Sequence, residues 1–201
     1  MTKKQKKQFT EIEAFLKSNL SNERLAHSYN VAKYARYLAT IYGKRKKTVR
    51  LAYFAGLIHD ICKELSDKEQ LAIFHKTGEQ LTKIEKQRIN LLHGATGAYV
   101  LKKKFGVKNS QVLEAVKFHT FGAKKLRTLG KLVFVADKIE PCRSSESAKN
   151  FRKIAGQISF NELTFRVLAD NIAYVEKKGG IVSPLSLKMK KKLEQKLSRC
   201  K

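Results

Sequence analysis

Apolar residues recur at intervals of three and four along almost the whole chain, and this spacing constrains the fold more than any other sequence feature. Phe9, Ile12, Phe15 and Leu16 show it near the N-terminus, and it is the period of one face of an α-helix. The 201 residues include only two prolines, which would interrupt helices. The sequence therefore predicts an all-α fold, a single-domain helical bundle.

Glycines and capping residues divide the chain into predicted helices. Thr48–Lys63 and Leu129–Glu140 are apolar over most of their circumference, so we expect them in the centre of the domain. Leu132–Ala136 contains enough β-branched residues to form a strand. Because no second strand-like segment could pair with it, we expect a helix. The other predicted helices are one around Phe9–Leu16, one from Ser21 or Asn22 to Tyr42, one capped by Asp67 and ending near Gly78, and Lys83–Leu92, Gly94–Phe105, Ser110–His119, 146–157, 160–177 and 184–198.

The chain is strongly basic, because its 43 Lys and Arg residues exceed its 17 Asp and Glu residues by 26. The excess is spread along the chain and is densest at both ends. We therefore divide the chain into a basic N-terminal tail (1–9), a domain (10–185) and a basic C-terminal helix or tail (186–201). Such charge attracts polyanions, but lysines also form ordinary solvated surfaces, and we assign most of them to that role. Weak nonspecific polyanion binding stays open.

Nothing in the sequence indicates a membrane protein. The longest apolar run, Leu51–Ile58, is far shorter than the roughly 20 residues that span a bilayer. The basic N-terminus is not followed by the apolar segment of a signal peptide. Cys62, Cys142 and Cys200 are odd in number and lack ligand-like spacing, which predicts free thiols in a reducing compartment. We expect a cytoplasmic protein without membrane contact.

Asp137 is the most informative single residue, because it lies inside an apolar helix. An unpaired buried carboxylate is very costly, so Asp137 needs a partner. No Lys or Arg precedes it by one helical turn, and Lys138 is expected to point to another face. A metal ion would meet the need, although pairing with a distant Arg is an alternative.

Histidines supply the other candidate ligands. His27, His59, Asp60 and Asp137 could offer four ligands from three helices, and Asp60 could bridge two metals. Imidazole and carboxylate together suit Fe, Mn, Zn or Co, and oxygen-rich positions also admit Mg. A lone histidine is usually an ordinary hydrogen-bonded residue, and this is our interpretation of His75. His93 and His119 would add two more ligands to the cluster.

Five short segments carry these residues in a fixed order: Arg24-Leu-Ala-His27-Ser28, Ala55-Gly56-Leu57-Ile58-His59-Asp60-Ile61-Cys62-Lys63, His93-Gly94, His119-Thr120 and Ala136-Asp137-Lys138-Ile139-Glu140-Pro141-Cys142-Arg143. Together they resemble the YqeK family of HD-domain metal-dependent phosphohydrolases, over roughly residues 10–185. Two positions depart from the family pattern. Phe118 stands where members often carry a second histidine before the His-Thr pair, and Cys142 stands where a glycine usually precedes the arginine.

The resemblance implies a helical bundle of the HD-domain type and symmetrical cleavage of diadenosine tetraphosphate, a dinucleoside polyphosphate, to two ADP. It implies iron, as one or two ions, with Mn, Co, Zn or Mg as alternatives. The implied metal ligands are His27, His59, Asp60 and Asp137. The implied catalytic residues are Asp60, Lys63, His93 and His119, and the substrate-binding residues are Arg24, His27, Asp60, Lys63, His93, His119, Asp137 and Arg143.

The chemistry of the reaction agrees with this separation of metal ligands from substrate-binding residues, because phosphoryl transfer depends on cations around the substrate. We expect Lys63 one turn after His59 on the same helical face, and Arg143 just past the break at Pro141. His93 and His119 could bind a second metal, or they could donate hydrogen bonds to phosphate and protonate the leaving group.

Two other functions stay open. One is an HD phosphohydrolase of another specificity, such as a nucleotidase, a dNTP hydrolase or a cyclic-dinucleotide phosphodiesterase. The other is a protein that binds RNA or ribosomes through its basic tails. A homodimer also stays open.

Overall fold

The computed structural model describes residues 3–200, apart from the side chains of residues 4, 5 and 200, and within this range all regular secondary structure is helical. The prediction of an all-α fold is confirmed. No helix within residues 3–200 combines the length and the apolarity needed to cross a membrane. In chain order the helices are α1 Lys3–Asn19, α2 Asn22–Ile41, α3 Lys46–Ile58, α4 Asp67–His75, α5 Lys83–Gln87, η1 Ile89–Leu92, α6 His93–Lys103, α7 Ser110–Phe118, α8 Thr128–Ile139, α9 Glu146–Ile154, α10 Phe160–Lys177, α11 Pro184–Leu197 and η2 Ser198–Cys200.

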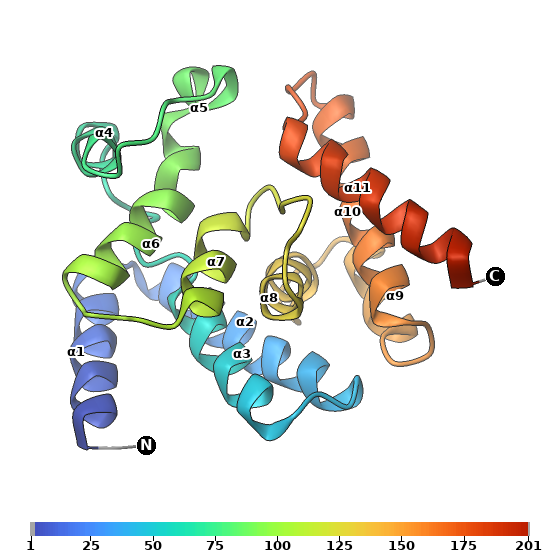
Figure 1. Cartoon of the computed structure of the whole chain (residues 1–201), viewed down its shortest axis with the longest axis horizontal. Coiled ribbons are helices and arrows are strands. Elements are labelled where there is room, and N and C mark those ends of the chain that lie inside the picture. The colour runs from blue at the N-terminus through green and yellow to red at the C-terminus, as the bar shows by residue number, and fades with distance from the viewer. Residues whose placement is uncertain (1–2, 201) are drawn as a thin grey trace.

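Helix α8 lies at the centre of the bundle, where Figure 1 shows it almost end-on. It packs on α2, α3 and α7, and α2 and α3 pack extensively on each other. Leu132–Ala136, the segment that could have been a strand, is helical and fully buried. A helix whose surface is buried on nearly every side needs apolar residues all round, which is the pattern that the sequence shows.

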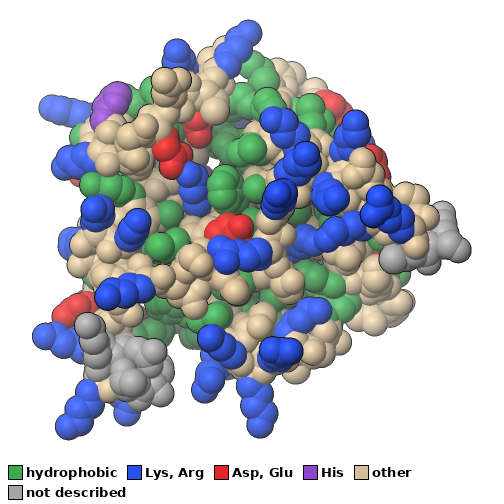
Figure 2. All heavy atoms as spheres, in the orientation of Figure 1, with side chains coloured by type: hydrophobic (Ala, Val, Ile, Leu, Met, Phe, Trp, Pro, Cys, Tyr) green, Lys and Arg blue, Asp and Glu red, His purple; other side chains and the backbone are tan. Residues whose placement is uncertain are grey.

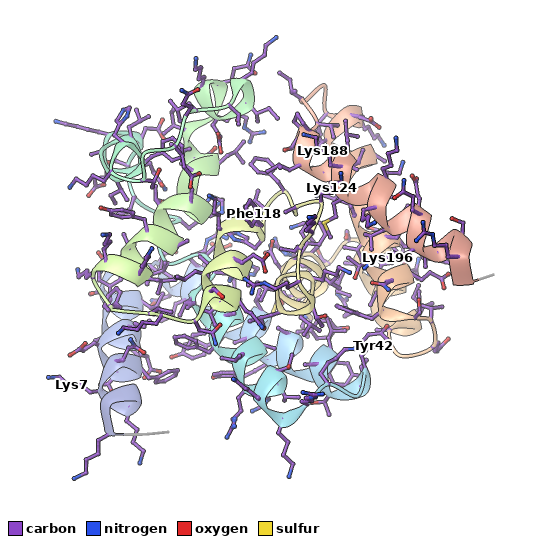
Figure 3. All side chains as sticks on the ribbon, in the orientation of Figure 1. Lys7, Tyr42, Phe118, Lys124, Lys188 and Lys196 are labelled. Atoms are coloured by element: carbon purple, nitrogen blue, oxygen red, sulfur yellow. The ribbon has the colours of Figure 1, made fainter. Side chains whose placement is uncertain are left out.

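Two groups of helices flank this centre (Figure 1). On one side α4 and η1 pack on α6, and on the other α10 packs on α11, α8 and α9. Tyr42, labelled in Figure 3, joins α2 to the second group. Its hydroxyl accepts a 3.0 Å hydrogen bond from the Gly156 backbone N–H, and its ring lies 5.0 Å from that of Phe160.

The start of α4 corrects one expectation about capping. Ser66, and not Asp67, is the N-cap residue. Its hydroxyl accepts a hydrogen bond from the Glu69 backbone N–H, and the Glu69 carboxylate accepts one in return from the Ser66 N–H at 2.9 Å. This reciprocal capping box satisfies two backbone donors at once, so it fixes the start of the helix better than Asp67 alone.

Both basic ends are helical where the structure describes them. Helix α1 already begins at Lys3, so residues 3–9 are not an extended tail. Helix α11 places Met189 and Leu193 in the hydrophobic core, with 1% and 2% of their surfaces exposed. The proposed division at residue 185 stays a prediction, but the C-terminal lysines are carried by a docked helix. Cys200 lies outside the described side chains, and Cys62 and Cys142 are free thiols, as predicted.

Two glycines let pairs of helices approach closely. A Cβ atom on Gly56 of α3 would lie 2.8 Å from the Ala32 Cα of α2. One on Gly94 of α6 would lie 2.6 Å from the Lys117 carbonyl oxygen of α7. No larger residue fits without moving backbone, so these glycines set the spacing of the α2–α3 and α6–α7 pairs.

Candidate active site

Helix α3 ends at Ile58, immediately before His59, whereas the sequence predicted a helix to Lys63. Tight turns follow, in which the Ile61 N–H bonds to the Ile58 carbonyl and the Lys63 N–H to the Asp60 carbonyl, at 3.2 and 2.8 Å. Lys63 is therefore not one helical turn after His59, and that expectation was wrong. The turns bury the Asp60 carboxylate at the end of α3, with 3% of the residue exposed.

Three histidines use one ring nitrogen to fix their orientation and direct the other toward Asp60. In each, Nδ1 lies close to the backbone carbonyl three residues earlier. Because a carbonyl can only accept, Nδ1 carries the proton and Nε2 presents a lone pair. The pairs are His59 with Gly56 at 2.7 Å, His93 with Asn90 at 2.6 Å, and His119 with Val116 at 2.7 Å.

Asp60 is the carboxylate that these nitrogens share. Its Oδ1 lies 3.4 Å from His93 Nε2 and 3.3 Å from His119 Nε2. Its Oδ2 lies 3.5 Å from His59 Nε2 and accepts a hydrogen bond from Arg24 Nη1 at 3.1 Å. The guanidinium of Arg24 favours the ionised carboxylate.

The donor set fits a metal ion. His93 Nε2 and His119 Nε2 lie only 3.0 Å apart, and His59 Nε2 is buried without a hydrogen-bond partner among the described residues. Lone pairs this close repel unless a proton or a cation lies between them. Asp60 belongs to two groups whose candidate ligand atoms lie within 4.8 Å of one another, one with His27 and His59 and one with His93 and His119. These nitrogen and oxygen donors suit Fe, Mn, Co or Zn.

Burial keeps the inner histidines in the form that binds metals. It lowers the pKa of His93 to about 3, helped by the neighbouring His119, and it also lowers the pKa of His119. Both imidazoles are therefore neutral near pH 7. The Thr120 hydroxyl lies 3.2 Å from Nε2 of each ring. Sequence reasoning assigned Thr120 no role, although this residue follows His119 directly.

Glu140 is a site residue that sequence reasoning also missed. His27 lies between two carboxylates, with Nε2 3.0 Å from Asp137 Oδ1 and Nδ1 3.2 Å from Glu140 Oε1. Burial lowers the pKa of His27, but the hydrogen bonds to Asp137 and Glu140 outweigh it and raise the pKa to about 9. Glu140 orients the ring as carboxylates beside metal-binding histidines do. The sequence signal for this role was the position of Glu140 three residues, about one helical turn, after Asp137.

Asp137 has two cationic partners: an arginine, which was the alternative to a metal ion, and Lys138, which was expected on another face. Lys138 does not point away, because its Nζ lies 3.1 Å from Asp137 Oδ2 and 3.2 Å from the His119 carbonyl oxygen. Arg143 donates from Nη2 to Asp137 Oδ1 at 3.0 Å and from Nε to the Asp137 carbonyl at 2.9 Å. Burial raises the pKa of Asp137, but Lys138 and the hydrogen bond with His27 hold it well below its ordinary value. Asp137 is therefore ionised and paired.

The candidate residues enclose a cavity of about 100 Å³. Lys63 Nζ lies 3.4 Å from His93 Nδ1, and burial lowers the pKa of Lys63. Arg24 and Arg143 are the more exposed cations, with 32% and 43% of their side chains accessible. His75 is exposed at the end of α4 and takes no part. The cavity is lined by Arg24, Asp60, Lys63, His93, His119, Thr120, Asp137 and Arg143.

A cluster of imidazoles around one carboxylate, held in a helical bundle, defines a class of metal-dependent hydrolases. The model of the HD domain family matches residues 24–142, and this chain belongs to that family. Membership of the HD-domain family, which the five short segments predicted, is confirmed.

Curated proteins and a solved structure resemble the chain over most of its length. A Staphylococcus aureus protein described as "Bis(5'-nucleosyl)-tetraphosphatase, symmetrical" is 30% identical over 81% of this chain and 82% of its own. A Bacillus subtilis protein with the same description is 28% identical over 85% of this chain and 89% of its own. The crystal structure of a predicted HD superfamily hydrolase involved in NAD metabolism, from Clostridium acetobutylicum, is 30% identical, with a TM-score of 0.85 over 94% of this chain and 97% of the other.

Proposed function

We propose that this chain is a metal-dependent hydrolase that cleaves diadenosine tetraphosphate symmetrically to two ADP. The observation that carries the proposal is the arrangement around Asp60, where two groups of metal-ligand type share one carboxylate beside Arg24, Lys63 and Arg143. Similarity to symmetrical tetraphosphatases over most of the chain supports the substrate.

Iron is the metal we propose, held by His27, His59, Asp60 and Asp137. The donor atoms of the first three lie within 4.8 Å of one another, and Asp137 Oδ1 lies 3.0 Å from His27 Nε2 and 3.7 Å from His59 Nε2. His93 and His119 share Asp60 with this set and would hold a second ion. A bound divalent metal lowers the pKa of water and stabilises negative charge on phosphate oxygens.

The cations beside the cluster bind and orient the phosphate chain. Arg24 is held by Asp60, and Arg143 by Asp137, so both guanidinium groups are fixed at the cavity before substrate arrives. Planar guanidinium groups bind phosphate oxygens in pairs, and Lys63 adds a charge deeper in the cavity. Water attacks one of the two central phosphorus atoms, the bond from that phosphorus to the central bridging oxygen breaks, ADP leaves with the electron pair, and the proton lost by the water passes to the solvent. These cations stabilise the growing negative charge.

Other nucleotide specificities are the second candidate. None of the eight residues that line the cavity is Phe, Tyr or Trp, so this part of the site recognises phosphate and not a base. Nucleotidase, dNTP hydrolase or cyclic-dinucleotide phosphodiesterase activity would use the same cluster.

We also propose that the protein works in the cytoplasm. Cys62 is a buried free thiol and Cys142 an exposed one, and both suit a reducing compartment.

A substrate comparison tests the proposed function. Purified, iron-reconstituted protein is incubated separately with diadenosine tetraphosphate, ATP, a dNTP and a cyclic dinucleotide, with and without a chelator. We expect the tetraphosphate to be cleaved fastest, and the chelator to stop the reaction. Preference for another substrate would favour the second candidate, and full activity in chelator would refute the role of the metal.

A further inference from the structure

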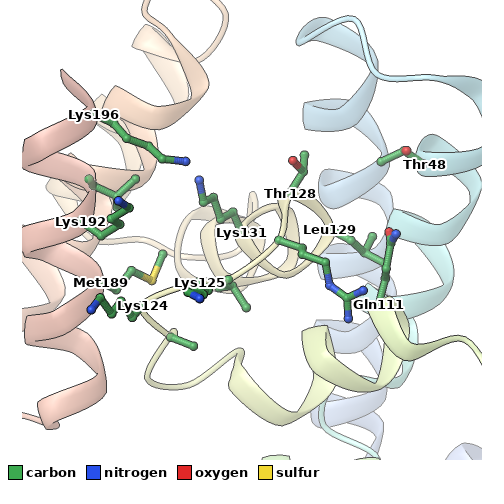
Figure 4. A pocket seen from close by; sticks show the side chains of 14 residues that line it. Thr48, Gln111, Lys124, Lys125, Thr128, Leu129, Lys131, Met189, Lys192 and Lys196 are labelled. Atoms are coloured by element: carbon green, nitrogen blue, oxygen red, sulfur yellow. The ribbon is translucent and has the colours of Figure 1, made fainter. Parts of the chain in front are cut away.

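A second, larger cavity lies away from the active site. It has a volume of about 520 Å³ and is formed by α11, the loop before α8, and the first turn of α8 (Figure 4). Asp137 follows Thr128 by nine residues on α8, which places the two sites about 14 Å apart along the helix. No residue lines both cavities.

The lining of this cavity is basic and contains no acidic residue. Figure 2 shows Lys and Arg side chains gathered over α11 and the loop before α8. Arg127 is neutralised by Glu114, whose Oε2 lies 2.6 Å from its Nε. Within the described part of the chain, the other cations of the lining form no ion pair. The cations of the lining are Lys124, Lys125, Arg127, Lys131, Lys192 and Lys196.

Lys131 is a half-buried cation of this lining. Its Nζ donates to Asn161 Oδ1 at 2.9 Å, and Figure 4 shows it pointing toward Lys196 from the opposite wall. Burial lowers the pKa of Lys131 to about 8, and the charges of Lys196 and Lys44 contribute to the shift. No side chain caps the N-terminus of α8, so the positive end of the helix dipole adds to the same field. An anion in the cavity would relieve the repulsion among these groups.

We propose that this basic cavity binds an anion with several adjacent phosphate groups, either a free polyphosphate chain or the phosphate end of a nucleotide. The five lysines around the cavity that form no ion pair with a described residue carry more positive charge than a single carboxylate would neutralise. The volume lies within the range of small-ligand sites. The lining contains no Phe, Tyr or Trp on which a base could stack, so phosphate groups are what it recognises.

A binding experiment tests this site without using catalysis. Tripolyphosphate, ATP and adenosine are titrated calorimetrically into the full chain carrying Lys63→Ala and Arg143→Ala, which removes phosphate-binding cations from the active site. Two double variants are then made in that background. The cavity pair is Lys192→Gln with Lys196→Gln, and the control pair is Lys178→Gln with Lys191→Gln. The control pair removes two exposed lysines outside the cavity and changes the net charge equally.

We expect tripolyphosphate and ATP to bind alike and adenosine not to bind. The cavity pair should weaken binding at least about tenfold, and the control pair about twofold or less. Lys131→Gln should weaken binding in the same way, although Lys131 lies on α8 and not on α11. Equal losses in both pairs, or no binding, would refute the proposal. So would binding of a single-stranded RNA through Lys192 and Lys196 when tripolyphosphate and ATP do not bind. The result does not depend on the proposed hydrolysis, whose failure would show only in the substrate comparison.

Discussion

Gly56 lies where α2 and α3 approach most closely, and Gly56→Ala tests whether this approach sets the spacing of the metal ligands. The new Cβ would lie 2.8 Å from Ala32 Cα and 3.0 Å from the Val31 carbonyl oxygen. Both are backbone atoms, so no side-chain rotation can relieve the contact. Reaching the 3.4 Å at which ordinary contact begins requires the helices to separate by roughly 0.6 Å.

The separation acts directly on the site, because α2 carries His27 and α3 leads into His59. Overpacking costs about 1–3 kcal/mol, and the better helix propensity of alanine returns up to about 1 kcal/mol. We expect metal-free Gly56→Ala to lose about 1–2 kcal/mol of unfolding free energy. Functional sites tolerate displacements of about 0.5 Å, so metal affinity should fall about tenfold or more.

Urea unfolding of the metal-free protein measures the first effect, and competition with a chelator of known affinity measures the second. Gly97→Ala is the matched control, since its Cβ would meet only the side-chain methyl groups of Ile61 and Val116, at 3.2 and 3.3 Å. We expect the control to keep its metal affinity. If Gly56→Ala loses stability but binds metal as tightly as the wild type, the close approach does not set the ligand spacing.

Three further predictions follow from named contacts. Asp60→Ala should lose turnover and bound metal together; full metal content with full rate would show that Asp60 is not the shared ligand. Lys63→Ala and Arg143→Ala should keep their metal but lose about tenfold to a hundredfold in kcat/KM, and metal loss in either would contradict a role in phosphate binding. Because the pKa of Lys131 is lowered to about 8 in the folded chain, the unfolding free energy of the wild type, measured relative to Lys131→Met, should rise as the pH increases from 8 toward 10.5. Solvent screening limits the rise to about 1 kcal/mol, and a constant difference in urea unfolding across that range would contradict the shift.

The periodicity of apolar residues predicted the helices well, because burial of one helical face leaves a direct trace in the sequence. It did not predict where α3 ends. No proline or glycine follows Ile58, and the turns from His59 to Lys63 are stabilised by the surrounding tertiary structure. The capping of α4 by Ser66 can be inferred from Glu69, which follows at the spacing of a capping box, although Asp67 beside it is also a common capping residue type.

The structure brings the predicted site residues together, but their pairing was not predicted, Thr120 and Glu140 were missed, and the roles of all these residues stay predictions. Sequence order identified the histidines and both aspartates, while the contacts of Asp137 with Lys138 and Arg143 depend on side chains that fold back at the end of α8. The helix over 184–198 was predicted as a surface helix, and its docking into the core was not predicted, because lysine-rich composition hides the buried positions of α11. Met189 and Leu193 show its docking only once the partner helices are placed.

The products formed in oxygen-18 water test the proposed reaction most directly. Iron-loaded protein is incubated with diadenosine tetraphosphate, and the nucleotides are separated and analysed by mass spectrometry. Attack on a central phosphorus predicts ADP as the sole product, with one labelled oxygen on the β-phosphate of half of the molecules and none on any α-phosphate. Equal amounts of ATP and AMP would show cleavage of an outer phosphoanhydride bridge and would contradict the assignment of this site to symmetrical cleavage.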